Sequence, residues 1–164
     1  MDAIACINTR YSCRSYLPKP VPRPLLEQLL DAGRRAPSGR KVEPVEFVVL
    51  TEQSSRDFLA ELTTYGKFLS QAGACVVVIA RDTKYYLEDG CAAAENILLA
   101  SYALGLASCW IAGDKKSYAP EILQRLGVPS GYKLIAMLAI GYPAAPGEQS
   151  QRRPLEQVAH WERF

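Results

Sequence analysis

The most constraining feature of this sequence is an unbroken apolar run at 74–80, with the residues ACVVVIA. A strand with one face in water alternates apolar and polar residues, whereas a strand covered on both faces is apolar at every position. The run is also rich in β-branched valine and isoleucine, which favour strands. We therefore expect a buried strand within a sheet that carries helices on both of its faces.

Other segments supply the helices and the further strands of this helix-covered sheet. Apolar residues at a 3.6-residue period indicate helices, and short apolar runs between turn residues indicate strands. The segment 105–113 has glycine at both ends, and we expect it to be a loop. We expect the other elements as helices at 2–9, 22–35, 52–69, 85–104 and 118–126, and as strands at 45–50 and 134–140.

Two apolar features point to a second copy of the chain. The helix at 85–104 has almost no polar face after Asn96, and its small residues at 90–94 would let another backbone come near. We expect a homodimer packed around this helix, because a chain of 164 residues offers few other elements to bury it. The segment 150–164 follows a polar linker and carries Trp161 and Phe164, so we expect an arm that docks on the partner subunit.

Composition restricts the class of protein and its partners. The chain has 49% hydrophobic and 22% charged residues, which is typical of one globular domain spanning 1–164. A net charge of +2 gives no reason to expect nucleic acid or a membrane surface as a partner. The sequence contains no apolar run of membrane-spanning length and no signal-peptide pattern at its start, so we expect a cytoplasmic protein.

The residues that usually carry catalysis are scarce. Five cysteines occur without a Cys-x-x-Cys pair, and His160 is the single histidine, so we expect no metal site and no Cys/His nucleophile pair. The sequence also lacks the Gly-x-Ser-x-Gly pattern of serine hydrolases. We expect buried or neutral thiols, and a cofactor that carries the chemistry of any enzyme built on this chain.

The stretch 10–14 (RYSCR) has the donors that a phosphate group needs. In an extended segment, even spacing places Arg10, Ser12 and Arg14 on one face. Guanidinium groups bind phosphate oxygens with paired donors, and the serine adds a hydroxyl. The alternative is a solvated basic turn that follows a short helix.

A second candidate for ligand binding is the loop at 36–41 (APSGRK). Its proline and glycine fix a turn and allow a close approach to a flat ligand, while Ser38, Arg40 and Lys41 supply donors. The alternative is a plain connection between a helix and a strand.

The order of these motifs resembles the nitroreductase family, in which homodimers hold FMN at the subunit interface. The resemblance covers the full length and rests on five segments in the right order. They are Arg10-x-Ser12-x-Arg14, Ala36-Pro37-Ser38-Gly39, Gly105-Leu106-Ala107-Ser108-Cys109-Trp110, Gly141-Tyr142-Pro143 and Arg152-Arg153-Pro154-Leu155-Glu156. The resemblance implies an α+β three-layer sandwich, with a central, mainly antiparallel sheet, helices on both faces and an intertwined homodimer.

Residue by residue, the resemblance assigns the two chain ends to the polar part of FMN. Arg10, Ser12 and Arg14 would bind its phosphate, ribityl chain and pyrimidine edge. Arg152, from the C-terminal arm, would be a second clamp on the phosphate. No residue is assigned as a catalytic side chain, since flavin N5 carries the chemistry in this family.

The resemblance assigns two other segments to the isoalloxazine ring. Pro37, Ser38 and Gly39 would line it from the other subunit, and the backbone of Ala112 and Gly113 would face N5 and O4. The implied activity is transfer of hydride from NAD(P)H to FMN and then, by ping-pong, to an electron-poor small molecule such as a nitroaromatic or a quinone.

Four positions differ from the pattern common in the family, and two of them, Glu43 and Val45, stand where glutamine and tryptophan are common. Lys41 stands where asparagine is common, and it either reaches the flavin as a cation or points to solvent. Ser150 replaces a common lysine before the C-terminal arginine, which removes one cation from the phosphate. Two alternative functions therefore stay open: a flavin enzyme of the same fold with another substrate, such as a dehydrogenase or dehalogenase, and a flavin-binding protein without catalysis.

Overall fold

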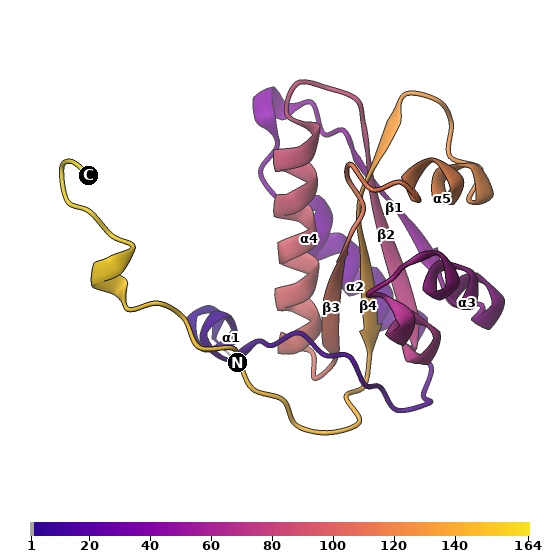
Figure 1. Ribbon diagram of the computed structural model, residues 1–164, viewed down its shortest axis with the longest axis horizontal. Coiled ribbons are helices and arrows are strands. Elements are labelled where there is room, and N and C mark those ends of the chain that lie inside the picture. The colour runs from indigo at the N-terminus through magenta and orange to yellow at the C-terminus, as the bar shows by residue number, and fades with distance from the viewer. Residues whose placement is uncertain (1) are drawn as a thin grey trace.

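A four-stranded antiparallel sheet forms the centre of the molecule, and helices cover both of its faces (Figure 1). The structure is a computed structural model that describes residues 2–164. The strand order is β1-β2-β4-β3, and each neighbouring pair is antiparallel. The strands are β1 (Val45–Leu50), β2 (Ala74–Arg81), β3 (Ala107–Ala112) and β4 (Tyr132–Gly141). This arrangement confirms the α+β class and the antiparallel sheet that the resemblance implied.

Five α-helices and three 3₁₀ turns are the other regular elements within residues 2–164. The helices are α1 (Ala3–Thr9), α2 (Arg23–Arg34), α3 (Gln53–Leu62), α4 (Tyr86–Ala103) and α5 (Ala119–Arg125). The 3₁₀ turns are η1 (Gly39–Lys41), η2 (Lys67–Gln71) and η3 (Leu155–Gln157). Asp2 begins α1 by accepting a hydrogen bond from the N–H of Ala5 (3.0 Å), and Gly105, with φ at 76°, ends α4 in the left-handed region.

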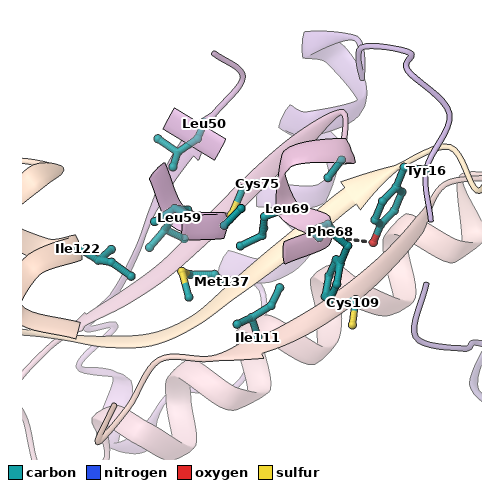
Figure 2. Packing of buried hydrophobic residues seen from close by; sticks show 14 of the residues in the cluster. Tyr16, Leu50, Leu59, Phe68, Leu69, Cys75, Cys109, Ile111, Ile122 and Met137 are labelled. Carbon is teal, nitrogen blue, oxygen red and sulfur yellow. Dashed lines mark hydrogen bonds between the residues drawn. The ribbon is translucent and has the colours of Figure 1, made fainter. Parts of the chain in front are cut away.

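The strand β2 separates two apolar clusters, as its continuous apolar sequence predicted. Cys75 and Val77 face the cluster covered by α3, η2 and α5, whereas Val76 and Val78 face the cluster covered by α2 and α4. This alternation follows from the two-residue period of a strand. Figure 2 shows the first cluster, where side chains from α3, η2 and α5 pack against the sheet.

The segment 105–113 contains a strand, so the prediction of a loop was wrong. Residues 107–112 form β3, an edge strand that pairs with β4 and places Ile111 opposite Met137. The glycine signals mark only the ends of this short element. Its pairing partner lies about 25 residues further along the chain, and a local pattern does not contain such non-local pairing.

The predicted helix at 52–69 is also wrong in its second half. α3 ends at Leu62, Thr63 is extended with ψ at 132°, and the chain resumes as η2 at Lys67. Two threonines, a tyrosine and a glycine in succession at 63–66 disfavour helix. The hydroxyl of Thr63 donates back to the carbonyl of Leu59 (3.0 Å) at this helix end. The break matters because residues 63–65 line a cavity described below.

The C-terminal segment runs away from the sheet beyond α1 (Figure 1). Leu155 and Trp161 are 73% and 87% exposed, so these apolar side chains are not covered by their own chain. Docking of this arm on a partner subunit stays a prediction. Within residues 2–164, no helix combines the length and the apolar composition needed to cross a membrane.

Candidate active site

The stretch 10–14 lies along the free edge of β3. Ser12 forms a parallel bridge with Ser108, and the N–H of Cys13 donates to the carbonyl of Ser108 (2.9 Å). The stretch is therefore held next to the sheet by main-chain contacts. Arg10, Ser12 and Arg14 all line one cavity, in keeping with their even spacing.

This cavity, which we call the phosphate cavity, also receives the C-terminal segment. It has a volume of about 190 Å³ and is lined by Arg10, Tyr11, Ser12, Arg14, Glu148, Gln149, Ser150 and Arg152. The side-chain amide of Gln149 donates to the carbonyls of Ile7 (3.0 Å) and Arg10 (3.2 Å), which ties the two ends of the chain together. The two basic stretches therefore meet within a single chain.

The charge of the phosphate cavity suits an anion. Three guanidinium groups line it against one lining carboxylate, that of Glu148. The guanidinium of Arg10 is also 3.6 Å from the carboxylate of Glu95 on α4, so part of its charge is already paired. Arg14 and Arg152 are thus the cations most available to a phosphate group. Of the lining residues, the sequence motifs did not identify Tyr11, Glu148 or Gln149.

A second cavity, which we call the aromatic cavity, shares Arg14 with the first. It has a volume of about 400 Å³. Its lining consists of Arg14, Leu62, Thr63, Thr64, Tyr65, Phe68, Cys109, Trp110, Ile111, Ala112, Lys116, Ser117 and Tyr118. Four of these side chains are aromatic and two are cationic, which suits a flat, electron-rich or anionic ligand. The sequence did not indicate residues 63–65, because they were expected inside a helix.

The main-chain N–H groups of Ala112 and Gly113 point to opposite sides of β3. The N–H of Gly113 already donates to the carbonyl of Ile135 (3.0 Å), on the β4 side. Main-chain groups alternate along a strand, and the carbonyl of Ala112 accepts a hydrogen bond from the hydroxyl of Tyr118, away from β4. Of the two predicted backbone donors, the N–H of Ala112 is thus the one directed off the sheet edge.

The loop at 36–41 lies elsewhere in the chain. Its Ser38 hydroxyl donates to Asp89 (2.7 Å) near the start of α4, whereas Tyr11 of the phosphate cavity packs its ring against Tyr102 near the end of α4. A rise of 1.5 Å per residue separates Asp89 from Tyr102 by roughly 20 Å. Within one chain, Pro37, Ser38 and Gly39 therefore do not join the phosphate cavity, and the exposed Lys41 lines none of the cavities described here.

The thiols show no sign of nucleophilic chemistry. Cys75 is fully buried, and burial raises the pKa of its thiol to about 12. Burial also raises the pKa of the Cys109 thiol, although nearby Arg14 partly opposes the shift. Four of the five cysteines are buried and all five are free, which confirms the expectation of buried or neutral thiols.

The fold and the basic cavity together describe an α+β protein equipped to hold an anionic small molecule. Comparison with known sequences makes the assignment specific, because the model of the nitroreductase family matches residues 7–71 and 60–142. The chain belongs to the nitroreductase family, whose members are NAD(P)H oxidoreductases.

Three relatives show how close the likeness is. A protein of Archaeoglobus fulgidus, provisionally named NADH dehydrogenase/NAD(P)H nitroreductase, is 31% identical over 87% of this chain and 86% of its own length. The FMN-dependent nitroreductase of Clostridium difficile has a TM-score of 0.91 and 29% identity, over 98% of this chain and 99% of that one. A provisionally named nitroreductase of Desulfovibrio desulfuricans, solved in complex with FMN, has a TM-score of 0.88 and 30% identity, over 100% and 98% of the two chains.

Proposed function

We propose that the chain is a cytoplasmic, FMN-dependent oxidoreductase that takes hydride from NAD(P)H and reduces an electron-poor small molecule, such as a nitroaromatic or a quinone. The observation that carries this proposal is the meeting of Arg10, Arg14 and Arg152 in one cavity that shares Arg14 with the aromatic cavity. A ligand with a phosphate at one end and a flat ring at the other matches this pair of adjoining cavities. FMN is such a ligand, and the relatives from Clostridium and Desulfovibrio are described with it.

The residues of the phosphate cavity fit the phosphate of FMN. Arg14 and Arg152 would supply paired donors, Arg10 a third cation, and Ser12 a hydroxyl. The volume of about 190 Å³ holds a phosphate group but not a ring system of the size of a flavin. The ring would therefore extend past Arg14 into the aromatic cavity.

The residues around the aromatic cavity fit the ring and its chemistry. When bound, FMN supplies the redox chemistry, because its N5 accepts hydride from a nicotinamide and passes it to an acceptor. Arg14 would place positive charge beside the ring, which favours its reduced, anionic form. The N–H of Ala112, a residue whose carbonyl accepts a hydrogen bond from Tyr118, would orient the ring without exchanging a proton with it.

The active unit that we propose is a homodimer. The 36–41 loop lines neither the phosphate cavity nor the aromatic cavity of its own chain, so we assign it to a flavin that is bound by a second chain. Apolar surface is available for such contact: Ile4 of α1 is 66% exposed, Leu99 of α4 is half-buried, and Trp161 of the arm is exposed. Exposed apolar surface of this kind is typical of a protein interface.

The proposed activity is tested with the purified protein. Oxidised flavin gives the protein a visible absorbance, which NADH or NADPH should bleach under anaerobic conditions. Addition of menadione or a nitrofuran should then restore it. A protein that takes up FMN but stays oxidised with both donors contradicts the hydride transfer, and a colourless protein that takes up no FMN contradicts the cofactor.

The phosphate cavity is tested by a double substitution. Arg10→Ala with Arg152→Ala should weaken FMN binding about 100-fold or more, because each substitution removes a charge-assisted hydrogen bond to the phosphate. Far-UV circular dichroism and sedimentation should show the same folded dimer. The matched control is Arg153→Ala, which removes the same charge from a neighbour that does not line the cavity. Equal FMN affinity in the double variant and the control contradicts the assigned cavity.

A further inference from the structure

A buried carboxylate near the start of α4 is directed at the 36–41 loop. Asp89 is only 6% exposed. Its carboxylate accepts hydrogen bonds from the hydroxyl of Ser38 (2.7 Å) and from the N–H of Gly39 (2.9 and 3.2 Å to its two oxygens). In the part of the chain that the structure describes, the hydrogen bonds of this side chain all go to the loop. A buried carboxylate is costly unless it is satisfied in this way, so the contact is specific.

The contact extends through Ser38 to the far side of the loop. The Ser38 oxygen that donates to Asp89 also accepts a hydrogen bond from the N–H of Glu43 (2.8 Å). Asp89 therefore fixes both ends of the turn, one directly and one through the serine. The single O–H donor of the serine is used inside the protein, so it is not available to donate to a ligand.

The backbone that these bonds hold is strained. Arg40, Lys41 and Glu43 have φ values of 57°, 57° and 48°, in the left-handed region that side-chain-bearing residues rarely adopt. Such a conformation is unfavourable for each of these residues, and it persists only when its surroundings enforce it. A simple connection between a helix and a strand needs no such conformation.

The loop is also seated closely on α4. A Cβ atom built at Gly39 would lie 2.7 Å from the side chain of Tyr85, so only glycine fits without a shift. On the opposite side, the guanidinium of Arg81 donates to the carbonyls of Val42 (3.2 Å) and Glu43 (3.3 Å). The loop is thus held in one conformation from two directions.

We propose that Asp89 is a positioning residue for the flavin: it holds the 36–41 loop in the conformation in which Pro37 and Gly39 line the ring bound by the partner subunit. This inference rests on the proposed function, since it takes the loop as part of a flavin site. Asp89 acts through the loop and does not touch the ring.

The anchor itself is tested first, in flavin-free protein. Asp89→Asn keeps the size of the side chain but turns one acceptor oxygen into a donor that faces the donors of Ser38 and Gly39. Hydrogen exchange of the Gly39 and Glu43 amides should become about tenfold faster or more, because Gly39 loses its acceptor and Ser38, the partner of Glu43, loses its own anchor. The matched control is Asp57→Asn on α3, whose carboxylate accepts from Gln53 and not from the loop. Unchanged exchange in Asp89→Asn overturns the anchor.

The effect on the flavin is tested next, with FMN at saturation. Asp89→Asn should bind FMN about tenfold more weakly, since one charge-assisted contact that orders the loop is lost. It should also shift the flavin's visible band and midpoint potential, which a mere loss of fold stability does not do at full occupancy. Faster loop exchange with unchanged affinity, band and potential overturns the positioning role.

Ser38 provides a second pair of variants in case Asp89→Asn does not fold. Ser38→Ala removes the hydroxyl that links Asp89 to Glu43, whereas Ser38→Thr keeps it. The alanine variant should reproduce the faster exchange and the weaker FMN binding, and the threonine variant should restore both. Identical behaviour of the two variants overturns the proposal. If the wild-type protein binds no FMN, but its Gly39 and Glu43 amides exchange more slowly than those of the variants, the anchor is confirmed and the proposed function is overturned.

Discussion

Cys75 is the second residue of β2 and has no exposed surface, and burial alone accounts for the raised pKa of its thiol. The neighbouring charge of Arg56 acts in the opposite direction and does not overcome the burial. A neutral, inaccessible thiol contributes packing and no chemistry. This thiol nevertheless makes the stability of the fold depend on pH.

We expect the stability to fall in alkaline solution, partly because of Cys75. Above its ordinary pKa of 9.0 the thiol ionises in the unfolded chain, but in the folded chain it keeps its proton until about 12. The unfolded state then binds fewer protons, so each pH unit in this range costs about 1.4 kcal/mol of unfolding free energy. Cys75→Ala should flatten the decline measured by urea unfolding between about pH 9 and about pH 11. Equal slopes in the two proteins contradict this cause.

The residues of the phosphate cavity show what a motif predicts and what it omits. Arg10, Ser12 and Arg14 were identified because their spacing is local and their chemistry is specific. Arg152 was identified through the family pattern, and the structure brings it to the same cavity. Glu148 was not identified, because a single carboxylate in a polar segment carries no pattern.

At the scale of elements, the predictions succeeded where burial is uniform. The strand at 74–80 was predicted because every residue is apolar, and α4 because its apolar surface runs for five turns. β3 was missed because an edge strand with small residues obtains its hydrogen bonds from β4, far along the chain. The break after α3 was missed because the apolar period continues across it into η2.

The turn after β3 gives a prediction at this scale. A Cβ atom at Gly113 would lie 2.5 Å from Cγ of Leu134 and 3.0 Å from the backbone of Ile135, and a paired strand moves little. Gly113→Ala should therefore lower the free energy of unfolding by about 1–3 kcal/mol. It should also disturb the neighbouring N–H of Ala112 and hence the flavin's visible band.

The control for this variant is Lys115→Ala, at an exposed position in the same turn. Thermal unfolding and the flavin spectrum of both variants provide the comparison. If Gly113→Ala is as stable as the control and has an unaltered spectrum, the close packing of this turn against β4 is not a constraint on the site.

At the scale of the whole molecule, the sequence predicted a partner that one chain does not display. The apolar residues of the arm and of α1 are exposed, and the 36–41 loop lines neither of the two cavities proposed for the flavin in its own chain. Packing within one chain thus leaves both facts unexplained, and a second copy explains both. The course of the arm on that copy depends on contacts between chains, which a single-chain pattern does not contain.

Removal of the arm tests its two proposed roles together. A chain that ends at Gln149 lacks Arg152 and all the exposed apolar residues of the arm. It should therefore lose FMN and sediment as a monomer that is lighter than the 18.1 kDa full chain. The control is the full chain with Trp161→Ala and Phe164→Ala, which keeps Arg152. This control should dissociate more readily while still binding FMN at high protein concentration. A truncated chain that stays a dimer contradicts the arm's part in assembly.

The central claim is that each flavin is held by two chains, and the FMN content of a mixed dimer tests it most directly. One chain carries Arg10→Ala and Arg152→Ala, the other carries Ser38→Trp and Gly39→Trp, and different affinity tags allow the mixed dimer to be isolated. Neither parent should retain FMN. The mixed dimer has one site built entirely from unaltered segments, so it should bind one FMN per two chains. A mixed dimer that forms but binds no FMN would contradict the claim. It would mean that each site is built from one chain, since both chains then carry an altered site.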